Sequence, residues 1–204
     1  MDKMCEHMKV FELSDPLFLP HCGCELQISV GTGKAVVLIG ENGIGKSTLL
    51  HRFYLDIPSD NRVVVEQKTS EYFFDRKLIT IKQFFLEAEL KGFNQNAFHI
   101  LWDAFDLNSK EERLISNLSG GESQALKLCM ALCKEAEYYF LDEPSQYLDQ
   151  SKKKVLLQFL ENLIFQGKRL LLVEHNRDWL PTGWDIQELK IEDNTLKQGA
   201  KWTT

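Results

Sequence analysis

The stretch Gly40–Thr48, which reads GENGIGKST, decides how this chain folds. It follows the unbroken apolar run Ala35–Ile39 (AVVLI), which is typical of a strand covered on both faces of a sheet. It leads into Ser47–Tyr54, where we expect a helix to begin. A strand, a glycine-rich turn and a helix in this order place backbone N–H groups and a helix N-terminus around an anion. The sequence therefore predicts a phosphate-binding loop.

The residues of this loop suit a nucleoside triphosphate. Gly43 and Gly45 have no side chain, so the backbone can wrap closely around phosphate groups. Lys46 should reach the β- and γ-phosphates, and the hydroxyl of Ser47 should coordinate Mg²⁺. The alternative is a glycine-rich turn that matches the pattern by chance. The strand before it and the helix after it argue against that alternative.

A second polar group follows a second apolar strand. Tyr138–Leu141 is short and apolar, and it ends in Asp142 and Glu143. In an open α/β sheet, chemistry gathers at the carboxyl ends of the strands. Asp142 would orient Mg²⁺ and its waters, and Glu143 could accept a proton from an attacking water. Two acidic residues at the end of a strand are usually exposed to solvent and have no catalytic role. The phosphate loop upstream is what favours a catalytic role here.

The remaining pattern alternates strands with helices. Further strands are expected at Leu26–Val30, Val63–Val65 and Arg169–Val173, and a closing hairpin turns at Asp193–Asn194. Helical spacing of apolar residues predicts two helices between residues 79 and 106, divided at Gly92 and Asn94, and others at Ser123–Ala136 and Lys152–Phe165. This alternation predicts an α/β fold with a mostly parallel core sheet. We also expect a small antiparallel β region at the N-terminus.

Bulk properties indicate an ordinary globular domain. The chain has 204 residues, of which 44% are hydrophobic, and a formal net charge of -6. A bulk attraction to nucleic acid is therefore not expected. No apolar run approaches the roughly 18 residues of a membrane helix, and the start MDKMCEHMKVFEL does not read as a secretory signal.

The cysteines indicate a reducing compartment. There are five, and an odd number argues against a disulfide framework. His21–Cys24 (HCGC) could hold a metal, but no second ligand pair lies at a familiar spacing, so an ordinary turn is the favoured interpretation. Cys129 and Cys133 are expected to be buried on one face of a helix.

One further motif discriminates among phosphate-loop proteins. With Leu118–Ser123, which reads LSGGES, the chain resembles the nucleotide-binding domain of ABC ATPases over almost its whole length. Tyr147–Asp149 resembles the D-loop of that family, His175 its switch histidine and Gln67 its Q-loop glutamine. The resemblance implies a P-loop NTPase fold in a single domain, residues 1–204, with a core of about 1–75 and 124–204. The region from about 76 to 123 would be the helical insert.

Two departures from the family pattern concern carboxylates. Glu122 stands where glutamine is commonest, and Glu174 stands where a small or hydroxyl residue is more usual.

The resemblance implies a role for each matching residue. Glu143, His175 and Lys46 would form the catalytic set, and Ser47, Gln67 and Asp142 would hold Mg²⁺. Phe18 is the candidate for stacking on adenine, with a plain core phenylalanine as the alternative. The expected contacts to ATP are Phe18, Glu41, Asn42, Gly43, Ile44, Gly45, Lys46, Ser47, Thr48, Gln67, Ser119, Gly120, Gly121, Glu122 and Asp149.

The function implied is that of an ATP-hydrolysing transporter subunit. Two chains, identical or different, would sandwich two ATP molecules head to tail, with Ser119 and Gly121 on the partner's γ-phosphate. A separately encoded membrane permease would be the second partner, and would hold the cytoplasmic chain on the inner face of the membrane. Phe73, Phe74, Phe84 and Phe85 would form a groove for this permease, or simply pack in the core. The alternatives are a non-transport ATPase of a macromolecular machine and an ATP sensor without turnover.

Overall fold

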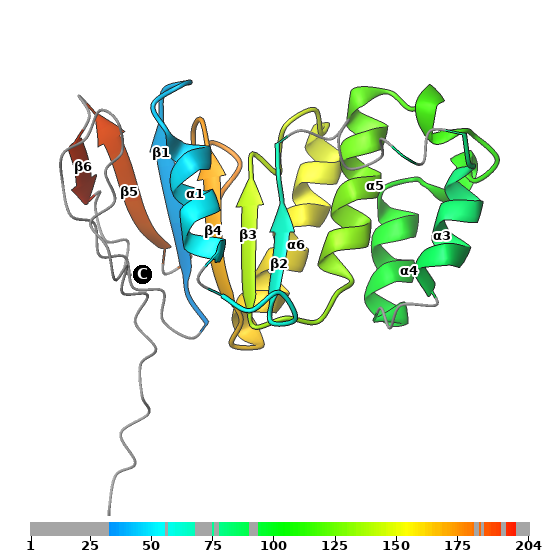
Figure 1. Ribbon diagram of the computed structural model, residues 1–204, viewed down its shortest axis with the longest axis horizontal. Coiled ribbons are helices and arrows are strands. Elements are labelled where there is room, and N and C mark those ends of the chain that lie inside the picture. Colours follow the sequence, from blue (N-terminus) through cyan, green and yellow to red (C-terminus); the bar gives the residue numbers. More distant parts are fainter. Residues whose placement is uncertain are drawn as a thin grey trace, which may run out of the picture.

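A computed structural model describes residues 33–55, 57–67, 75, 78–89, 94–181, 184, 186–192 and 195–198. These residues form a sheet of strand order β2-β3-β4-β1-β5-β6 (Figure 1). All neighbouring strands pair in parallel except β5 and β6, which form the antiparallel hairpin that the sequence predicts. The strands are β1 (Ala35–Gly40), β2 (Arg62–Val65), β3 (Tyr138–Asp142), β4 (Arg169–Glu174), β5 (Ile186–Glu192) and β6 (Thr195–Gln198).

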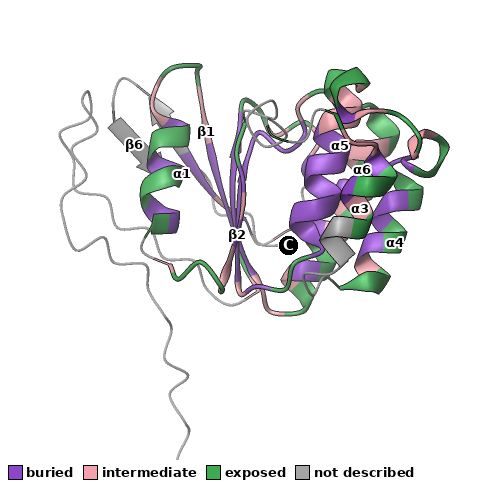
Figure 2. Ribbon diagram, turned by 45° about the vertical axis from the view of Figure 1, so that its right-hand side comes forward, coloured by how far each residue is buried: buried purple, intermediate pink, exposed green. Residues whose placement is uncertain are grey.

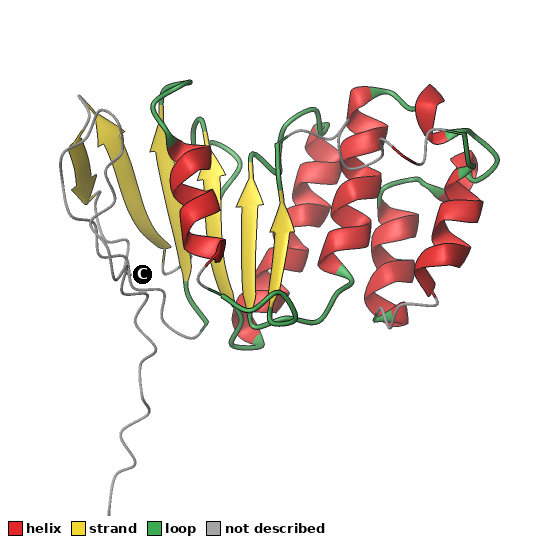
Figure 3. Ribbon diagram, viewed as in Figure 1, coloured by secondary structure: helices red, strands yellow, loops and turns green. Residues whose placement is uncertain are grey.

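Helices cover both faces of this sheet. Figure 2 shows α1 on one face and α5 and α6 on the other, and Figure 3 shows α3 and α4 beyond α5. The helices are α1 (Lys46–Leu55), α3 (Ile81–Glu89), α4 (Gln95–Ala104), α5 (Gly120–Leu132) and α6 (Gln150–Phe165), with short 3-10 turns at Asn108–Lys110 and Ile115–Asn117. Two helices thus lie between residues 79 and 106, as predicted. The division into a core and an inserted subdomain stays a prediction.

The apolar run of β1 explains why the strand is buried on both sides. Successive side chains of a strand point to opposite faces of the sheet. Val36 and Leu38 pack in the cluster that contains Leu49 and Phe53 of α1. Ala35 and Val37 pack instead in the cluster formed with α5 and α6. Both faces of β1 therefore require apolar residues, which is why the run AVVLI does not alternate.

Polar caps set where three helices begin. The Asn94 side chain accepts from the N–H of Ala97 and starts α4, where the sequence predicts a division between helices. Ser119 caps α5, so this helix begins at Gly120, three residues earlier than Ser123. Asp149 caps α6 in the same way, and the helix begins at Gln150. Periodicity locates the apolar face, whereas the cap decides the first residue.

The aromatic residues of α3 and α4 pack against each other. Phe85 stacks on Phe98 with ring centroids 4.3 Å apart, and Phe98 stacks on Trp102 at 4.9 Å. Phe84 is buried in the same core cluster. Core packing is therefore confirmed for Phe84 and Phe85.

Several predictions fall outside the described residues. These are the N-terminal β region with Leu26–Val30, the adenine-stacking role of Phe18, the HCGC stretch His21–Cys24, and Phe73 and Phe74. Cys129 and Cys133 are described, and both are free and buried as expected. Within the described part of the chain, no helix is long and apolar enough to cross a membrane.

Candidate active site

The strand order brings three distant segments to one edge of the sheet. β1 pairs with β4, and β4 pairs with β3. Their carboxyl ends carry the phosphate loop after β1, Asp142 and Glu143 at β3, and Glu174 and His175 at β4. Parallel neighbours place these ends side by side, as in other open α/β sheets whose sites lie there.

The phosphate loop has the backbone form that its glycines permit. Gly43 has a φ of 79° and Gly45 a φ of 100°, a region that residues with side chains rarely adopt. Lys46 follows at the first position of α1 and is buried, with Nζ donating to the carbonyls of Gly40 (2.7 Å) and Glu41 (2.9 Å). Burial lowers the pKa of Lys46, while nearby carboxylates, Glu143 foremost, act in the opposite direction. The loop thus holds one buried ammonium inside an exposed turn.

Asp142 has the environment of a cation ligand. It is buried, and its Oδ1 has no hydrogen-bond partner among the described residues. The hydroxyl of Ser47 contacts the same carboxyl group. Burial raises the pKa of Asp142, and the Ser47 bond and the charges of Lys46 and Lys127 oppose this rise. A buried carboxylate oxygen without a donor, next to a hydroxyl, fits a hard cation such as Mg²⁺.

Glu143 is held from both sides by the strands that flank β3. Gln67 follows β2 and donates from Nε2 to Oε2 of Glu143 at 2.9 Å. His175 follows β4, and its Nε2 lies 2.9 Å from Oε1. Glu143 is only 4% exposed and has a φ of 48°, which is rare for a residue with a side chain. The structure therefore brings together Glu143, Gln67 and His175, which the sequence separates by up to 108 positions.

Glu174 is a third buried carboxylate at this edge, after Asp142 and Glu143. Its two oxygens accept from the N–H (3.2 Å) and the hydroxyl (3.1 Å) of Ser145. Burial raises the pKa of Glu174 to about 7; the bonds from Ser145 lower it and the charge of Glu143 raises it further. The sequence shows Glu174 as a departure from the family pattern. Only the fold shows that it supports the turn after Glu143.

The LSGGES motif forms the start of α5. Ser119 and Glu122 make a reciprocal capping box, and Glu122 also accepts from Arg113 at 3.1 Å. The backbone N–H of Ser119 is the main reason that the pKa of Glu122 is lowered. A Cβ at Gly121 would lie 2.6 Å from the carbonyl oxygen of Tyr147, so only glycine fits there. The carboxylate of Glu122 is thus engaged in starting the helix.

This motif does not meet the phosphate loop of its own chain. Figure 1 shows β4, β3 and β2 between the loop that follows β1 and the top of α5. Ser119 and Gly120 are exposed at that helix end. The N-terminus of α5, with the partial positive charge of a helix start, therefore lies at the surface.

Asp149 has a structural role in the described chain. Its carboxylate accepts from the N–H of Lys152 (2.9 Å) and the hydroxyl of Ser151 (2.6 Å), and it lies 2.7 Å from the ammonium of Lys152. These bonds hold the pKa of Asp149 well below its usual range. Its expected contact with nucleotide stays a prediction.

Two buried residues of α5 were missed by sequence reasoning. Gln124 donates to the carbonyls of Glu143 (3.5 Å) and Pro144 (3.2 Å). Lys127 donates to the carbonyls of Glu66 and Gln67. Burial lowers the pKa of Lys127 to about 8. The sequence feature that could have pointed to Lys127 is its position inside an otherwise apolar stretch of a predicted helix.

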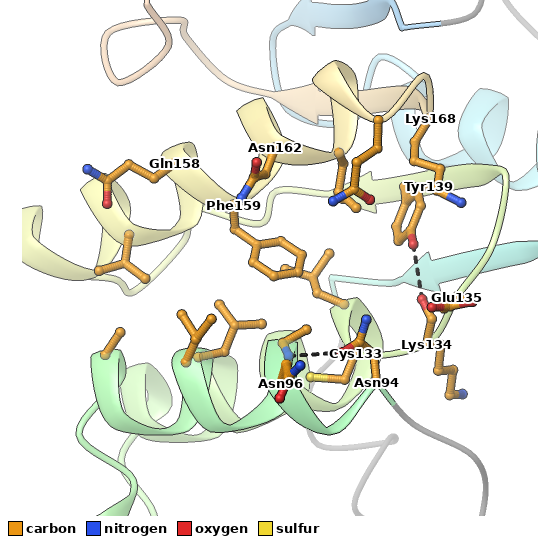
Figure 4. Close-up of a pocket in the computed structure, with 18 residues that line it drawn as sticks. Asn94, Asn96, Cys133, Lys134, Glu135, Tyr139, Gln158, Phe159, Asn162 and Lys168 are labelled. Carbon is orange, nitrogen blue, oxygen red and sulfur yellow. Dashed lines mark hydrogen bonds between the residues drawn. The ribbon is translucent and has the colours of Figure 1, made fainter.

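A cavity of 530 Å³ lies elsewhere, between α4 and α6 (Figure 4). Asparagine and glutamine side chains line the cavity around Phe159, and Tyr139, near the start of β3, borders it. Asp142 and Glu143 lie at the opposite end of that strand. The predicted catalytic residues Lys46, Glu143 and His175 therefore lie at the phosphate-loop edge and do not line this cavity.

Comparisons with known proteins agree with this geometry. A model of the ABC transporter family matches residues 24–146. The chain is 30% identical over 179 residues to the lipoprotein-releasing system ATP-binding protein LolD of Leptospira interrogans, covering 74% of this chain and 75% of that protein. It is 31% identical over 146 residues to the translation initiation factor rli1 of Schizosaccharomyces pombe, covering 69% of this chain and 23% of that protein.

Solved structures show the same fold. An ATP-binding subunit of an ABC transporter superposes with a TM-score of 0.71 at 20% identity, covering 86% of this chain and 82% of that one. RNase-L Inhibitor superposes with a TM-score of 0.68 at 25% identity, covering 84% and 39%. The fold is therefore that of the P-loop NTPases. Because the family match spans more than half of the sequence, this chain belongs to the ABC transporter family and is an ATP-binding ATPase.

Proposed function

We propose that this chain hydrolyses ATP as one half of a head-to-tail dimer and powers a separately encoded membrane transporter. The observation that carries the proposal is the Glu143 carboxylate, held between Gln67 and His175 beside the buried Lys46. Similar proteins of comparable length include LolD and a manganese transport system ATP-binding protein from Listeria innocua, 28% identical over 178 residues. A chain of this kind would act on the cytoplasmic face of the membrane, through a permease.

The residues divide the chemistry among them. The N–H groups of Gly43–Thr48 and the ammonium of Lys46 bind the phosphates of ATP. Ser47 and Asp142 would hold Mg²⁺, which would supply positive charge to neutralise the phosphates. Glu143 accepts the proton of the attacking water.

Contacts within the site favour these assignments. The two partners of Glu143 leave its carboxylate little freedom to rotate, so the proton acceptor is already oriented. His175, whose side chain is 40% exposed, contacts Glu143 and can also reach outward to the γ-phosphate. Lys46 provides a desolvated positive charge within the same group of side chains.

A second chain would complete the site. The N-terminus of α5 is exposed and lies apart from the phosphate loop of its own chain. Its free N–H groups and partial positive charge suit an anion, here the γ-phosphate of ATP bound to a partner. Two chains related head to tail would place Ser119, Gly120 and Gly121 of each against the nucleotide of the other. The partner can be an identical or a related chain.

Glu143→Gln tests the chemistry and the dimer together. The substitution keeps the size of the side chain and removes the proton acceptor, so turnover should be lost while ATP still binds. Light scattering should then show a dimer that forms only with ATP. The control is Glu135→Gln, which changes an exposed carboxylate and should hydrolyse ATP normally. Wild-type turnover by Glu143→Gln would remove Glu143 as the base, and a monomer with bound ATP would refute the head-to-tail dimer.

A second candidate is a non-transport ATPase that acts on a macromolecular machine. The likeness to rli1 and to the ribosome protection protein VmlR of Bacillus subtilis, 28% identical over 197 residues, favours it. The chain covers only 23% and 30% of those proteins. Purification of the tagged chain from its own cells separates the two functions. A multi-helix membrane protein as its stoichiometric partner supports transport, and ribosomes in its place would overturn the transporter proposal.

A further inference from the structure

Lys127 is a buried cation to which the chemistry above gives no role. It lies in the middle of α5 and is 1% exposed, among the largest fully buried side chains of the described residues. Its ammonium donates to the carbonyls of Glu66 and Gln67, the latter at 3.4 Å. Burying an ammonium is costly, and an apolar side chain of similar length would fill the same volume. Packing alone therefore does not explain the charge.

The two carbonyls belong to the residues that directly follow β2. This strand pairs with β3 over Arg62–Val65 and is the edge strand of the described sheet. The ladder of backbone hydrogen bonds has ended where Glu66 and Gln67 begin. Lys127 supplies charged donors at this point, and hydrogen bonds from a charged donor are stronger than those between neutral groups.

This short stretch of backbone carries the side chain that orients Glu143. Gln67 donates from Nε2 to Oε2 of Glu143 at 2.9 Å. Gln124, three residues before Lys127 on α5, donates to the carbonyls of Glu143 and Pro144. Glu143 has a φ of 48°, and a residue with a side chain keeps this strained conformation only while its surroundings hold it. α5 therefore holds Glu143 at two points, directly through Gln124 and through Gln67 by way of Lys127.

We propose that Lys127 is a positioning residue that fixes Gln67 and, through Gln67, the carboxylate of Glu143. This inference rests on the proposed role of Glu143 as the base. Lys127 links α5, the helix that Ser119 caps, to the proposed hydrolytic centre of the same chain. Contact of a second chain with the exposed N-terminus of α5 could shift this helix against β2. Lys127 would then transmit the movement to Gln67, because its ammonium is bonded to the backbone there.

Kinetics of the full chain test the inference. Lys127→Met removes the ammonium and keeps the length of the side chain. It should lower kcat about 10- to 100-fold, by analogy with residues that orient metal ligands through hydrogen bonds. KM for ATP should stay within about twofold, because the phosphate loop is untouched. Lys127→Arg keeps the charge and should recover part of the loss. Lys134→Met removes an exposed lysine next to the end of the same helix and should behave as wild type.

A double-mutant cycle separates positioning from a general structural role. Because Lys127 acts through Gln67, adding Lys127→Met to Gln67→Ala should lower kcat by less than about twofold beyond Gln67→Ala alone. If Lys127→Met lowers kcat by the same factor in the wild type and in Gln67→Ala, the inference is overturned. A rise in KM with kcat unchanged overturns it as well. If Lys127→Met does not fold, Lys127→Gln enters the same cycle.

Amide hydrogen exchange gives a readout that does not need turnover. In the full chain without nucleotide, Lys127→Met should accelerate exchange about tenfold or more in Arg62–Gln67 and in the turn after Asp142, but not in Arg169–Val173. Unchanged exchange overturns the inference even where kcat falls. If the wild-type chain does not hydrolyse ATP, the proposed function fails. Faster exchange would then still establish that Lys127 fixes Gln67.

Discussion

Replacing Glu174 by glutamine should make the stability of this chain less dependent on pH. Glu174 is 4% exposed, and burial raises the pKa of its carboxyl group from an ordinary value of 4.5 to about 7. Glutamine has the same shape and can still accept from the N–H of Ser145. The variant therefore isolates the effect of the charge.

The sign follows from the direction of this pKa difference. Below the unfolded pKa both states are protonated, and the buried group carries no penalty. As the pH rises to and through the folded pKa, the unfolded chain ionises first, so the wild type loses stability. The separation between 4.5 and about 7 corresponds to a loss of about 3 kcal/mol once both states are ionised. Glutamine does not titrate and avoids this loss.

The assay is urea unfolding of both proteins, followed by tryptophan fluorescence, from about pH 5 to about pH 8. The free energy of unfolding of Glu174→Gln minus that of the wild type should rise by about 2–3 kcal/mol over this range. Titrating groups that do not interact with Glu174 cancel in the difference. Glu135→Gln removes an exposed carboxylate and should change the free energy of unfolding by less than about 0.5 kcal/mol throughout. A Glu174→Gln difference that stays constant with pH would refute the reasoning.

Three further substitutions test single contacts. Gly121→Ala would place a Cβ 2.6 Å from the Tyr147 carbonyl oxygen. It should lower the free energy of unfolding, measured by urea titration, by about 1–3 kcal/mol. Gly43→Ser is the comparison, because a Cβ at Gly43 meets no atom within 4 Å although its φ is unfavourable for a side chain. Lys46→Met should weaken ATP binding at least about tenfold by calorimetry, since it removes the only lysine of the phosphate loop; equal affinity would contradict that role. Asp142→Asn removes the charge that would hold Mg²⁺, so kcat should need at least about tenfold more Mg²⁺, and an unchanged Mg²⁺ titration would remove Asp142 as a ligand.

Local sequence patterns located β1, β2, β3 and β4 to within one residue at each end. The apolar runs at Ala35–Ile39 and Tyr138–Leu141 indicated buried parallel strands because a strand covered on both faces cannot alternate. The motif after the first run, and Asp142–Glu143 after the second, located the polar residues of the site. Helix starts were less well predicted, since a cap such as Ser119 or Asp149 acts through one hydrogen bond rather than through periodicity.

The sequence by itself determined the α/β class and the strand ends at which the proposed catalytic residues lie, because these follow from local patterns of apolar, glycine and charged residues. Tertiary structure alone decided which residues meet. Strand order β2-β3-β4 places Gln67 and His175 on either side of Glu143, and no local pattern encodes that order. The buried contacts of Glu174 and Lys127 have the same origin, since a charged side chain reveals its partner only when distant segments pack together and exclude water.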